Sequence, residues 1–376
     1  MLRRLSAFLA LPLFLLLLAR PAWSQQSAAA DSDTTVTQET LDDLRQEMNA
    51  ALSELTARLN EARNRIAQDG VDGVIYARWN DDLAQQHGKN QFDLDRVYLN
   101  VRGTLNRSGV YRVTLDVSRT SGDRFFEFLK YAYGGIAFNP HATVLLGMQQ
   151  TPLIDFQEGL WKYRFLQKVM SDNEGKITSS DLGVGAEGVV NPDLSYKIMI
   201  SNGEGFNAAE KGRDKTLAGR LTYIVKPGLR LSAFAQYGLT DTTDLDSKGK
   251  PFRTPGLVKD RYDFLVSYER PDAVVYLEGL GAEDQSTPGG HRTQSGGVSL
   301  AGWWEFIQDW RVVGKFDNYD PDRQKPDNAH LGGMLGVSYN WGNNLVVALT
   351  DQFVNYGNLA KKTNTNQLFV QAQITY

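Results

Sequence analysis

The sequence contains no cysteine, so a disulfide framework and a thiolate metal site are both excluded. It has only four histidines, each in or next to an expected connection between elements, and no two of them share a metal-ligand spacing: His87, His141, His291 and His330. A formal net charge of −4 provides no strong field of one sign and argues against a nucleic-acid-binding protein. We therefore expect no metal, no cofactor and no nucleic-acid partner.

A long apolar run occurs only at the start of the sequence. Arg3 and Arg4 precede the apolar stretch from Leu5 to Leu18, and Ala22-Trp23-Ser24 follows as a small-x-small cleavage site. This order predicts a signal peptide over 1–24. A membrane anchor is the alternative, but the apolar run is short for a helical span. Without a helical span, a secreted chain can still be an integral membrane protein if it forms a closed barrel.

The next segments are polar and then helical in pattern. Residues 25–37 are small and polar, which predicts a flexible linker. Over 38–70 apolar residues recur at heptad spacing, with mixed charges on the flanks and the first seam at Leu41, Met48, Leu55 and Ala62. This pattern predicts an α-helical coiled coil, and its seam residues weakly favour three or more strands. A single amphipathic helix lying on another surface is the alternative.

From about residue 71 to 376 the pattern changes to alternation with a period of two. Val97, Leu99 and Val101 fall on one face, for example, while Arg96 and Tyr98 fall on the other. This pattern predicts β-strands with one apolar and one polar face. About sixteen such strands are expected, at 73–80, 95–105, 110–118, 125–137, 142–150, 182–190, 194–201, 216–224, 229–238, 261–269, 273–281, 295–304, 310–317, 330–341, 345–353 and 366–376.

The connections between the expected strands alternate between short and long. Every second one is tight and rich in residues that favour turns, as in Asn191-Pro192-Asp193, Lys226-Pro227-Gly228 and Arg270-Pro271-Asp272. The others are longer and polar, and the longest covers about 151–181. Short turns at one end and long loops at the other are typical of an all-β transmembrane barrel, with its apolar face toward lipid and its polar face toward the lumen. A soluble sandwich offers no reason for this alternation.

Several segments resemble the phosphate-selective porin O and P family. They are Asp95-Arg96-Val97-Tyr98-Leu99-Asn100-Val101-Arg102-Gly103, Val144-Leu145-Leu146-Gly147-Met148-Gln149-Gln150-Thr151-Pro152-Leu153, Ile200-Ser201-Asn202-Gly203-Glu204-Gly205, Leu217-Ala218-Gly219-Arg220-Leu221 and Phe316-Asp317-Asn318-Tyr319-Asp320-Pro321-Asp322. The resemblance implies a sixteen-stranded trimeric barrel in the outer membrane of a Gram-negative bacterium, with a long third loop that folds inward. It also implies a lumen lined with arginines. The coiled coil would then lie in the periplasm, where a cell-wall or periplasmic partner could bind it.

The face assignment supplies the candidate residues of the pore, because selectivity depends on lumen charge and on the width of the constriction. We expect the pore-lining basic residues to be Arg78, Arg96, Arg102, Arg112, Lys197, Arg220, Arg230, Arg311 and Lys315. We expect the pore-lining acidic residues to be Asp116, Glu187, Asp263, Glu269, Glu278 and Asp317. In the third long loop the candidates for the constriction are Glu158, Lys162, Arg164 and Lys168.

Two interpretations of the lumen charges remain open. A row of guanidinium groups can pass an oxyanion from site to site, since each offers several donors in a fixed geometry. Alternatively, the charges pair with one another and only fill a wet lumen. We expect a porin, a passive channel for small solutes that prefers anions such as phosphate. The alternatives are a structural protein that tethers the envelope through its coiled coil, and an enzyme, which we do not expect because no nucleophile–base arrangement can be assembled.

Overall fold

The computed structural model describes residues 70–83, 90–105, 108–119, 124–139, 141–208, 210, 214–245, 250–285, 287, 290–357 and 362–376. The predicted signal peptide, linker and coiled coil lie outside these residues, apart from Gly70, which is the first residue of strand β1. Within the described residues, no helix has the length and the apolar character needed to cross a membrane.

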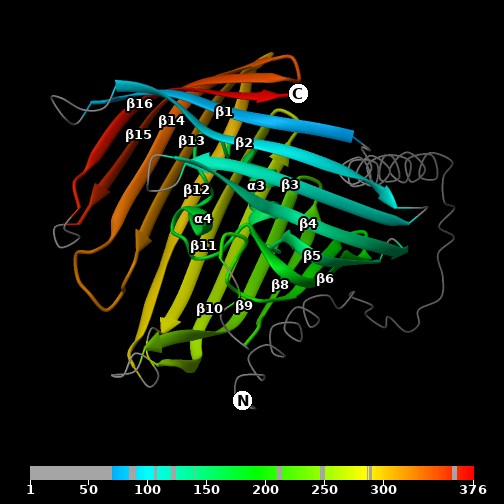
Figure 1. The fold of residues 1–376 in the computed structure, drawn as a ribbon. Coiled ribbons are helices and arrows are strands. Elements are labelled where there is room, and N and C mark those ends of the chain that lie inside the picture. The colour runs from blue at the N-terminus through cyan, green and yellow to red at the C-terminus, as the bar shows by residue number, and fades with distance from the viewer. Residues whose placement is uncertain are drawn as a thin grey trace, which may run out of the picture. The chain divides into compact units, whose positions relative to one another are not determined.

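Sixteen antiparallel strands close into one barrel, as the alternation predicted (Figure 1). The strands are β1 Gly70–Asp82, β2 Asn90–Leu105, β3 Gly109–Arg119, β4 Phe125–Asn139, β5 Ala142–Gln150, β6 Ser180–Asn191, β7 Leu194–Ser201, β8 Thr216–Lys226, β9 Leu229–Leu245, β10 Pro251–Arg270, β11 Ala273–Gln285, β12 Arg292–Ile307, β13 Trp310–Asp320, β14 His330–Trp341, β15 Leu345–Tyr356 and β16 Thr365–Thr375. Each expected strand has its counterpart, and β9 and β10 extend well beyond the expected 229–238 and 261–269.

Each strand pairs with its neighbours in sequence, and the first strand pairs with the last. The closing seam runs from the pair Val74 and Thr375 to the pair Asp82 and Gln367. Beyond it, Gly73 and Tyr376 exchange two backbone hydrogen bonds of 2.9 and 3.0 Å. Closure therefore leaves every backbone ladder of the barrel with a partner, which is the condition for placing strands in hydrocarbon.

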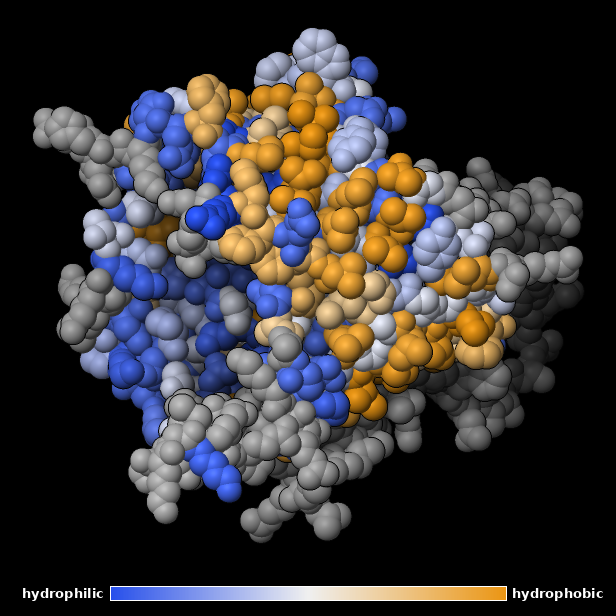
Figure 2. Space-filling view, viewed as in Figure 1, coloured by the Kyte–Doolittle hydropathy of each residue, from blue (hydrophilic) through white to orange (hydrophobic). Residues whose placement is uncertain are grey.

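Many apolar residues of the strands face outward. Leu146 on β5, Ile200 on β7 and Leu335 on β14 are each more than half exposed, whereas the polar neighbours Gln149 and Ser201 are buried inside. Figure 2 shows apolar side chains spread over the visible middle of the barrel wall, with hydrophilic residues gathered at one end. This is the reverse of a soluble protein, where the exposed face of a sheet is polar.

Aromatic residues near the short turns also lie on the outer face. Tyr223, Tyr268, Trp310 and Trp341 are all exposed there, and the rings of Trp310 and Tyr339 stack at 4.9 Å between centroids. Each of these residues lies within a few positions of a tight turn. Rings with one apolar body and one polar atom suit the boundary between hydrocarbon and water.

The third long loop, residues 151–179, folds into the barrel as the resemblance implied. It carries two short helices, α3 Ile154–Trp161 and α4 Met170–Asn173, which Figure 1 draws within the ring of strands. Its apolar side chains are fully buried, namely Leu153, Ile154, Trp161, Val169 and Met170. Burial of this size in a loop shows that it packs as part of the core and narrows the lumen.

The walls of the barrel hold this loop at many points. The Tyr163 hydroxyl lies 2.9 Å from Ser338 Oγ of β14, and Gln371 Nε2 of β16 donates to the Phe165 carbonyl oxygen at 2.8 Å. At the other side Arg261 of β10 donates to the Lys176 carbonyl oxygen at 2.7 Å. The loop is therefore fastened to strands on opposite sides of the closed sheet.

Candidate functional site: the constriction

A β-bulge in β4 places an unexpected cation inside the barrel. Thr114 of β3 pairs with Tyr131, but the next residue, Leu115, pairs with Leu129, so Lys130 is the extra residue. A bulge changes the direction of the side chains around it. Lys130 and Tyr131 consequently both point inward and are 2% and 7% exposed.

The Lys130 ammonium belongs to a group of charges on the wall. Its Nζ atom donates to the Tyr98 hydroxyl at 2.9 Å, and Arg96 Nη1 donates to the same oxygen at 2.9 Å. Arg96 also forms an ion pair of 3.3 Å with Asp116. Lys130 has no carboxylate partner among the described residues, and its other neighbours are aromatic faces, such as that of Phe206 at 5.8 Å.

The inward-folded loop brings its own charges to this wall. Arg164 Nε lies 2.7 Å from Glu158 Oε1, and its Nη2 atom lies 3.4 Å from Asp172 Oδ2. The charge of Arg164 acts on the Tyr98 phenol, and that of Lys130 acts on Glu158. We call Arg96, Tyr98, Lys130, Glu158 and Arg164 the constriction cluster, because the wall and the loop meet there.

The two other expected loop residues lie apart from the constriction cluster. Lys168 pairs with Asp172 at 3.3 Å and keeps 39% of its side chain exposed. Lys162 ends helix α3 in a left-handed conformation, with a φ of 61°, and its Nζ atom lies 5.2 Å from the centre of the Trp303 ring. Of the four residues predicted for the constriction, Glu158 and Arg164 therefore act electrostatically on the wall residues.

Most of the nine basic strand residues predicted for the lumen are neutralised by carboxylates. Seven form ion pairs: Arg78 with Asp93 and Asp95, Arg96 with Asp116, Arg102 with Asp72, Lys197 with Glu187, Arg230 with Glu269, Arg311 with Glu305 and Lys315 with Asp317. For these seven residues the geometry matches the second interpretation, in which lumen charges pair with one another.

Arg112 and Arg220 differ from the other seven, because neither has an ion pair among the described residues. Arg112 donates to the Asn100 amide oxygen and to the Thr114 hydroxyl, both at 3.0 Å, and lies over the ring of Tyr131 at 4.4 Å. Its charge is thus held by neutral oxygens and an aromatic face, which leaves it available to a passing anion.

Arg220 couples β8 to the start of the third loop. Its Nε atom donates to the Pro152 carbonyl oxygen at 2.7 Å, and its guanidinium lies 4.3 Å from the centre of the Phe156 ring. The exposed carboxylate of Asp155 acts on it through space. This arginine therefore positions the loop and carries a charge that is only partly balanced.

Two of the expected acidic residues form a carboxyl pair. Asp263 of β10 and Glu278 of β11 lie at diagonal positions on neighbouring strands, and their carboxyl oxygens have no hydrogen-bond partner among the described residues. Both are buried inside the barrel, at 5% and 0% exposure. The inner wall therefore holds two neighbouring carboxyl groups that form no ion pair among the described residues.

Three inward cations, Lys130, Arg261 and Lys259, were not predicted from the sequence, each for a different reason. Lys130 falls in 125–137, where the bulge breaks the alternation used to assign faces. Arg261 is only 2% exposed and lies two residues before Asp263 on the same face of β10. The alternation alone could therefore have predicted its inward orientation. Lys259 also faces inward, but it precedes the stretch 261–269 that the pattern had marked as a strand.

Comparisons with known proteins support the fold. No family model matches the sequence, and no curated protein matches it. Among solved structures, the barrel is similar to the trimer form of OmpT, an outer membrane protein of Vibrio cholerae, with a TM-score of 0.57 and 12% identity over 82% of this chain and 98% of that chain.

Two porins show the same likeness. OmpF of Salmonella typhi, in complex with daunomycin, gives a TM-score of 0.59 at 12% identity over 82% of this chain and 97% of that chain. The anion-selective porin from Comamonas acidovorans gives a TM-score of 0.58 at 12% identity over 82% of this chain and 99% of that chain. Identities this low establish a shared architecture, and the chain therefore has the fold of an outer-membrane porin.

Proposed function

We propose that this protein is an outer-membrane porin, a passive diffusion channel for small solutes that prefers anions. The apolar outer face, the polar inner face and the closed antiparallel barrel support a membrane-spanning channel. The loop that crosses the lumen would form the constriction, where selectivity is set. The resemblance to porins supports a channel rather than an enzyme.

The observation that carries the anion preference is the set of inward cations without a carboxylate partner. Among the described residues these include Lys130, Arg112 and Arg220, whereas the acidic residues Asp116, Glu187 and others are held by ion pairs. These cations at the loop would attract anions that pass through the constriction.

Phosphate or a similar oxyanion is the solute class that we propose. Guanidinium groups offer several donors in a plane, which matches the oxygens of such ions. The resemblance of the strand segments to the phosphate-selective porin O and P family supports the same class. We also propose a homotrimer in the outer membrane of a Gram-negative bacterium, with the predicted coiled coil in the periplasm, supported by the trimer form of the OmpT structure.

The test is the reversal potential of the purified protein in a planar bilayer under a potassium chloride gradient. We expect the sign of the reversal potential to indicate that chloride passes more easily than potassium. We also expect the current to fall when phosphate is added. The variant Lys226→Gln serves as a control, because this exposed lysine lies beside a tight turn outside the lumen. A cation-selective or non-selective pore that ignores phosphate would contradict the proposal.

A further inference from the structure

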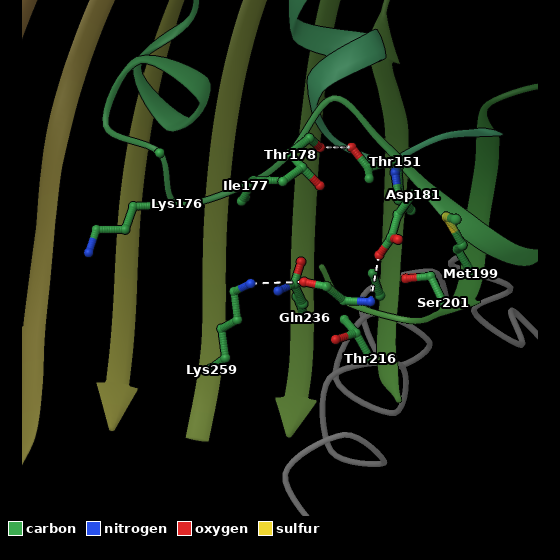
Figure 3. Close-up of a pocket in the computed structure, with 14 residues that line it drawn as sticks. Thr151, Lys176, Ile177, Thr178, Asp181, Met199, Ser201, Thr216, Gln236 and Lys259 are labelled. Carbon is green, nitrogen blue, oxygen red and sulfur yellow. Dashed lines mark hydrogen bonds between the residues drawn. The ribbon is translucent and has the colours of Figure 1, made fainter. Parts of the chain in front are cut away.

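A partly open space of about 410 Å³ lies at the root of the third loop, away from the constriction cluster. The loop contributes its first residues, Thr151 and Pro152, and its last, from Gly175 to Thr178. The inner wall of β6 to β10 forms the opposite side. Figure 3 shows Ser201, Thr216, Gln236 and Lys259 on this wall.

The frame of this pocket is fixed by hydrogen bonds to the backbone. The Thr151 hydroxyl donates to the Thr178 carbonyl oxygen at 2.5 Å, which ties the two ends of the loop together. Asp181 accepts from the Leu182 amide at 2.8 Å and from the Gly203 amide at 2.6 Å, one with each oxygen. The Asp181 carboxylate thus holds Gly203 in its left-handed turn, with a φ of 97°.

Three neutral polar side chains in the pocket make no hydrogen bond to the other lining residues (Figure 3). They are Ser201, Thr216 and Gln236, which are 5%, 4% and 9% exposed. Ser201 and Thr216 face each other directly across β7 and β8. None of the three belongs to the buried polar groups that are sealed without a partner, so their polar atoms can form hydrogen bonds with water or a ligand in the pocket.

One cation accompanies these groups. Lys259 Nζ donates to the Gly203 carbonyl oxygen at 2.9 Å and has no ion pair among the described residues. Glu204, Asp284 and Asp181 act on it only through space. The neighbouring cations are already engaged, since Lys176 and Arg261 both pair with Asp284, at 3.0 and 2.5 Å.

We infer that this pocket binds a monoanionic hydroxy acid, a solute with one carboxylate and several hydroxyl groups. Lys259 would neutralise the single carboxylate, and Ser201, Thr216 and Gln236 would exchange hydrogen bonds with the hydroxyl groups. A dianion would face one available ammonium and the Asp181 carboxylate, so the balance of charge favours one negative charge. This inference deepens the proposed function by naming a solute class, and it rests on that function for the path to the pocket.

The experiment measures how gluconate reduces the single-channel current in potassium chloride. Gluconate should act at a lower concentration than acetate, which lacks hydroxyls, than glucose, which lacks charge, and than phosphate. Lys259→Gln should raise the half-effective gluconate concentration about tenfold, since it removes one charge-assisted hydrogen bond. The double variant Ser201→Ala/Thr216→Ala should bring gluconate and acetate closer together.

Lys325→Gln is the matched control, because this lysine is 73% exposed in the loop after β13 and pairs with Asp322 outside the pocket. It should leave the gluconate titration unchanged. Equal effects of gluconate and acetate, or a gluconate titration that Lys259→Gln does not change, would each overturn the inference. Loss of folding by a variant is recognised by the absence of channels, in which case the solute series on the wild-type protein decides.

The reversal potential separates this inference from the proposed anion preference. If the wild-type pore does not prefer chloride but gluconate still acts through Lys259, the pocket stands and the preference fails. If the pore prefers chloride and gluconate has no specific effect, the preference stands and the pocket inference is wrong.

Discussion

The Lys130 ammonium and the Arg96 guanidinium both donate to the hydroxyl of Tyr98, each at 2.9 Å. Two cations on one neutral oxygen repel each other, and of the two only Arg96 forms an ion pair among the described residues, with Asp116. The arrangement persists because the barrel and the bulge hold Lys130 in place. An incoming anion would relieve the repulsion between the Lys130 and Arg96 side chains.

Removing the charge of Lys130 should weaken anion preference. A unit charge at a few ångströms in the lumen is worth about 1 kcal/mol after screening, so Lys130→Gln should lower the chloride-to-potassium permeability ratio about fivefold. The measurement is the reversal potential in potassium chloride at low and high ionic strength, with the difference shrinking at high salt. An unchanged ratio would show that Lys130 does not face the conducting path.

Neutralising Glu158 should have the opposite effect and should remove part of the pH dependence. Burial raises the pKa of the Glu158 carboxyl above its ordinary value, against the opposing charges of Arg164 and Lys130. Glu158 therefore takes up a proton at a higher pH than a free glutamate, and anion preference should rise as the pH falls from 7 to 5. Glu158→Gln should prefer anions more strongly than the wild type at pH 7 and should respond less to pH. Equal pH responses of the two proteins would contradict this assignment.

Asp155 offers a test near the other partly balanced cation. Its exposed carboxylate acts on Arg220 and Lys197 through space. Asp155→Asn should therefore increase the chloride-to-potassium permeability ratio, by a factor of about two to five for a charge screened by lumen water. Asp193→Asn, in an exposed tight turn, is the control and should leave the ratio unchanged. A fall in the ratio for Asp155→Asn would mean that this carboxylate serves only to hold the loop.

The packing of the loop can be tested at Trp161. This side chain is fully buried, and its Nε1 atom donates to the Gln167 carbonyl oxygen at 2.8 Å. Trp161→Ala should destabilise the loop by about 3 to 5 kcal/mol and allow it to leave its position, which should raise the single-channel conductance. Trp341→Ala is the matched control, because Trp341 is 71% exposed on the outer face. A conductance equal to that of the wild type would show that the loop keeps its place without Trp161.

The strands and turns could be predicted because their signals are local. Alternation along Asp95 to Gly103 and turn residues such as Asn191-Pro192-Asp193 depend on neighbours in sequence, and the closed barrel keeps both. The inward face followed from the same rule. The beginning of an irregular strand could not be predicted by this rule. Strand β10 begins at Pro251 and carries Lys259 before the regular alternation starts.

The charge balance of the site could not be predicted, because it depends on contacts between distant residues. Arg102 pairs with Asp72 of the neighbouring strand, and Arg164 in the loop pairs with Glu158 and Asp172. No spacing in the sequence distinguishes these arginines from Arg112, which has no such partner. The bulge at Lys130 is likewise a property of two strands together.

The seam between β1 and β16 sets a condition on how the protein is made. Val74 and Thr375 are direct partners, and the backbone of Gly73 bonds to that of Tyr376. The pairing that closes the barrel thus joins residues at opposite ends of the barrel sequence, the kind of contact that forms slowly. Until β16 has paired, β1 and β15 would each expose an unpaired edge that can join another chain. Biogenesis should therefore require a holding factor that covers both edges until the last strand is delivered.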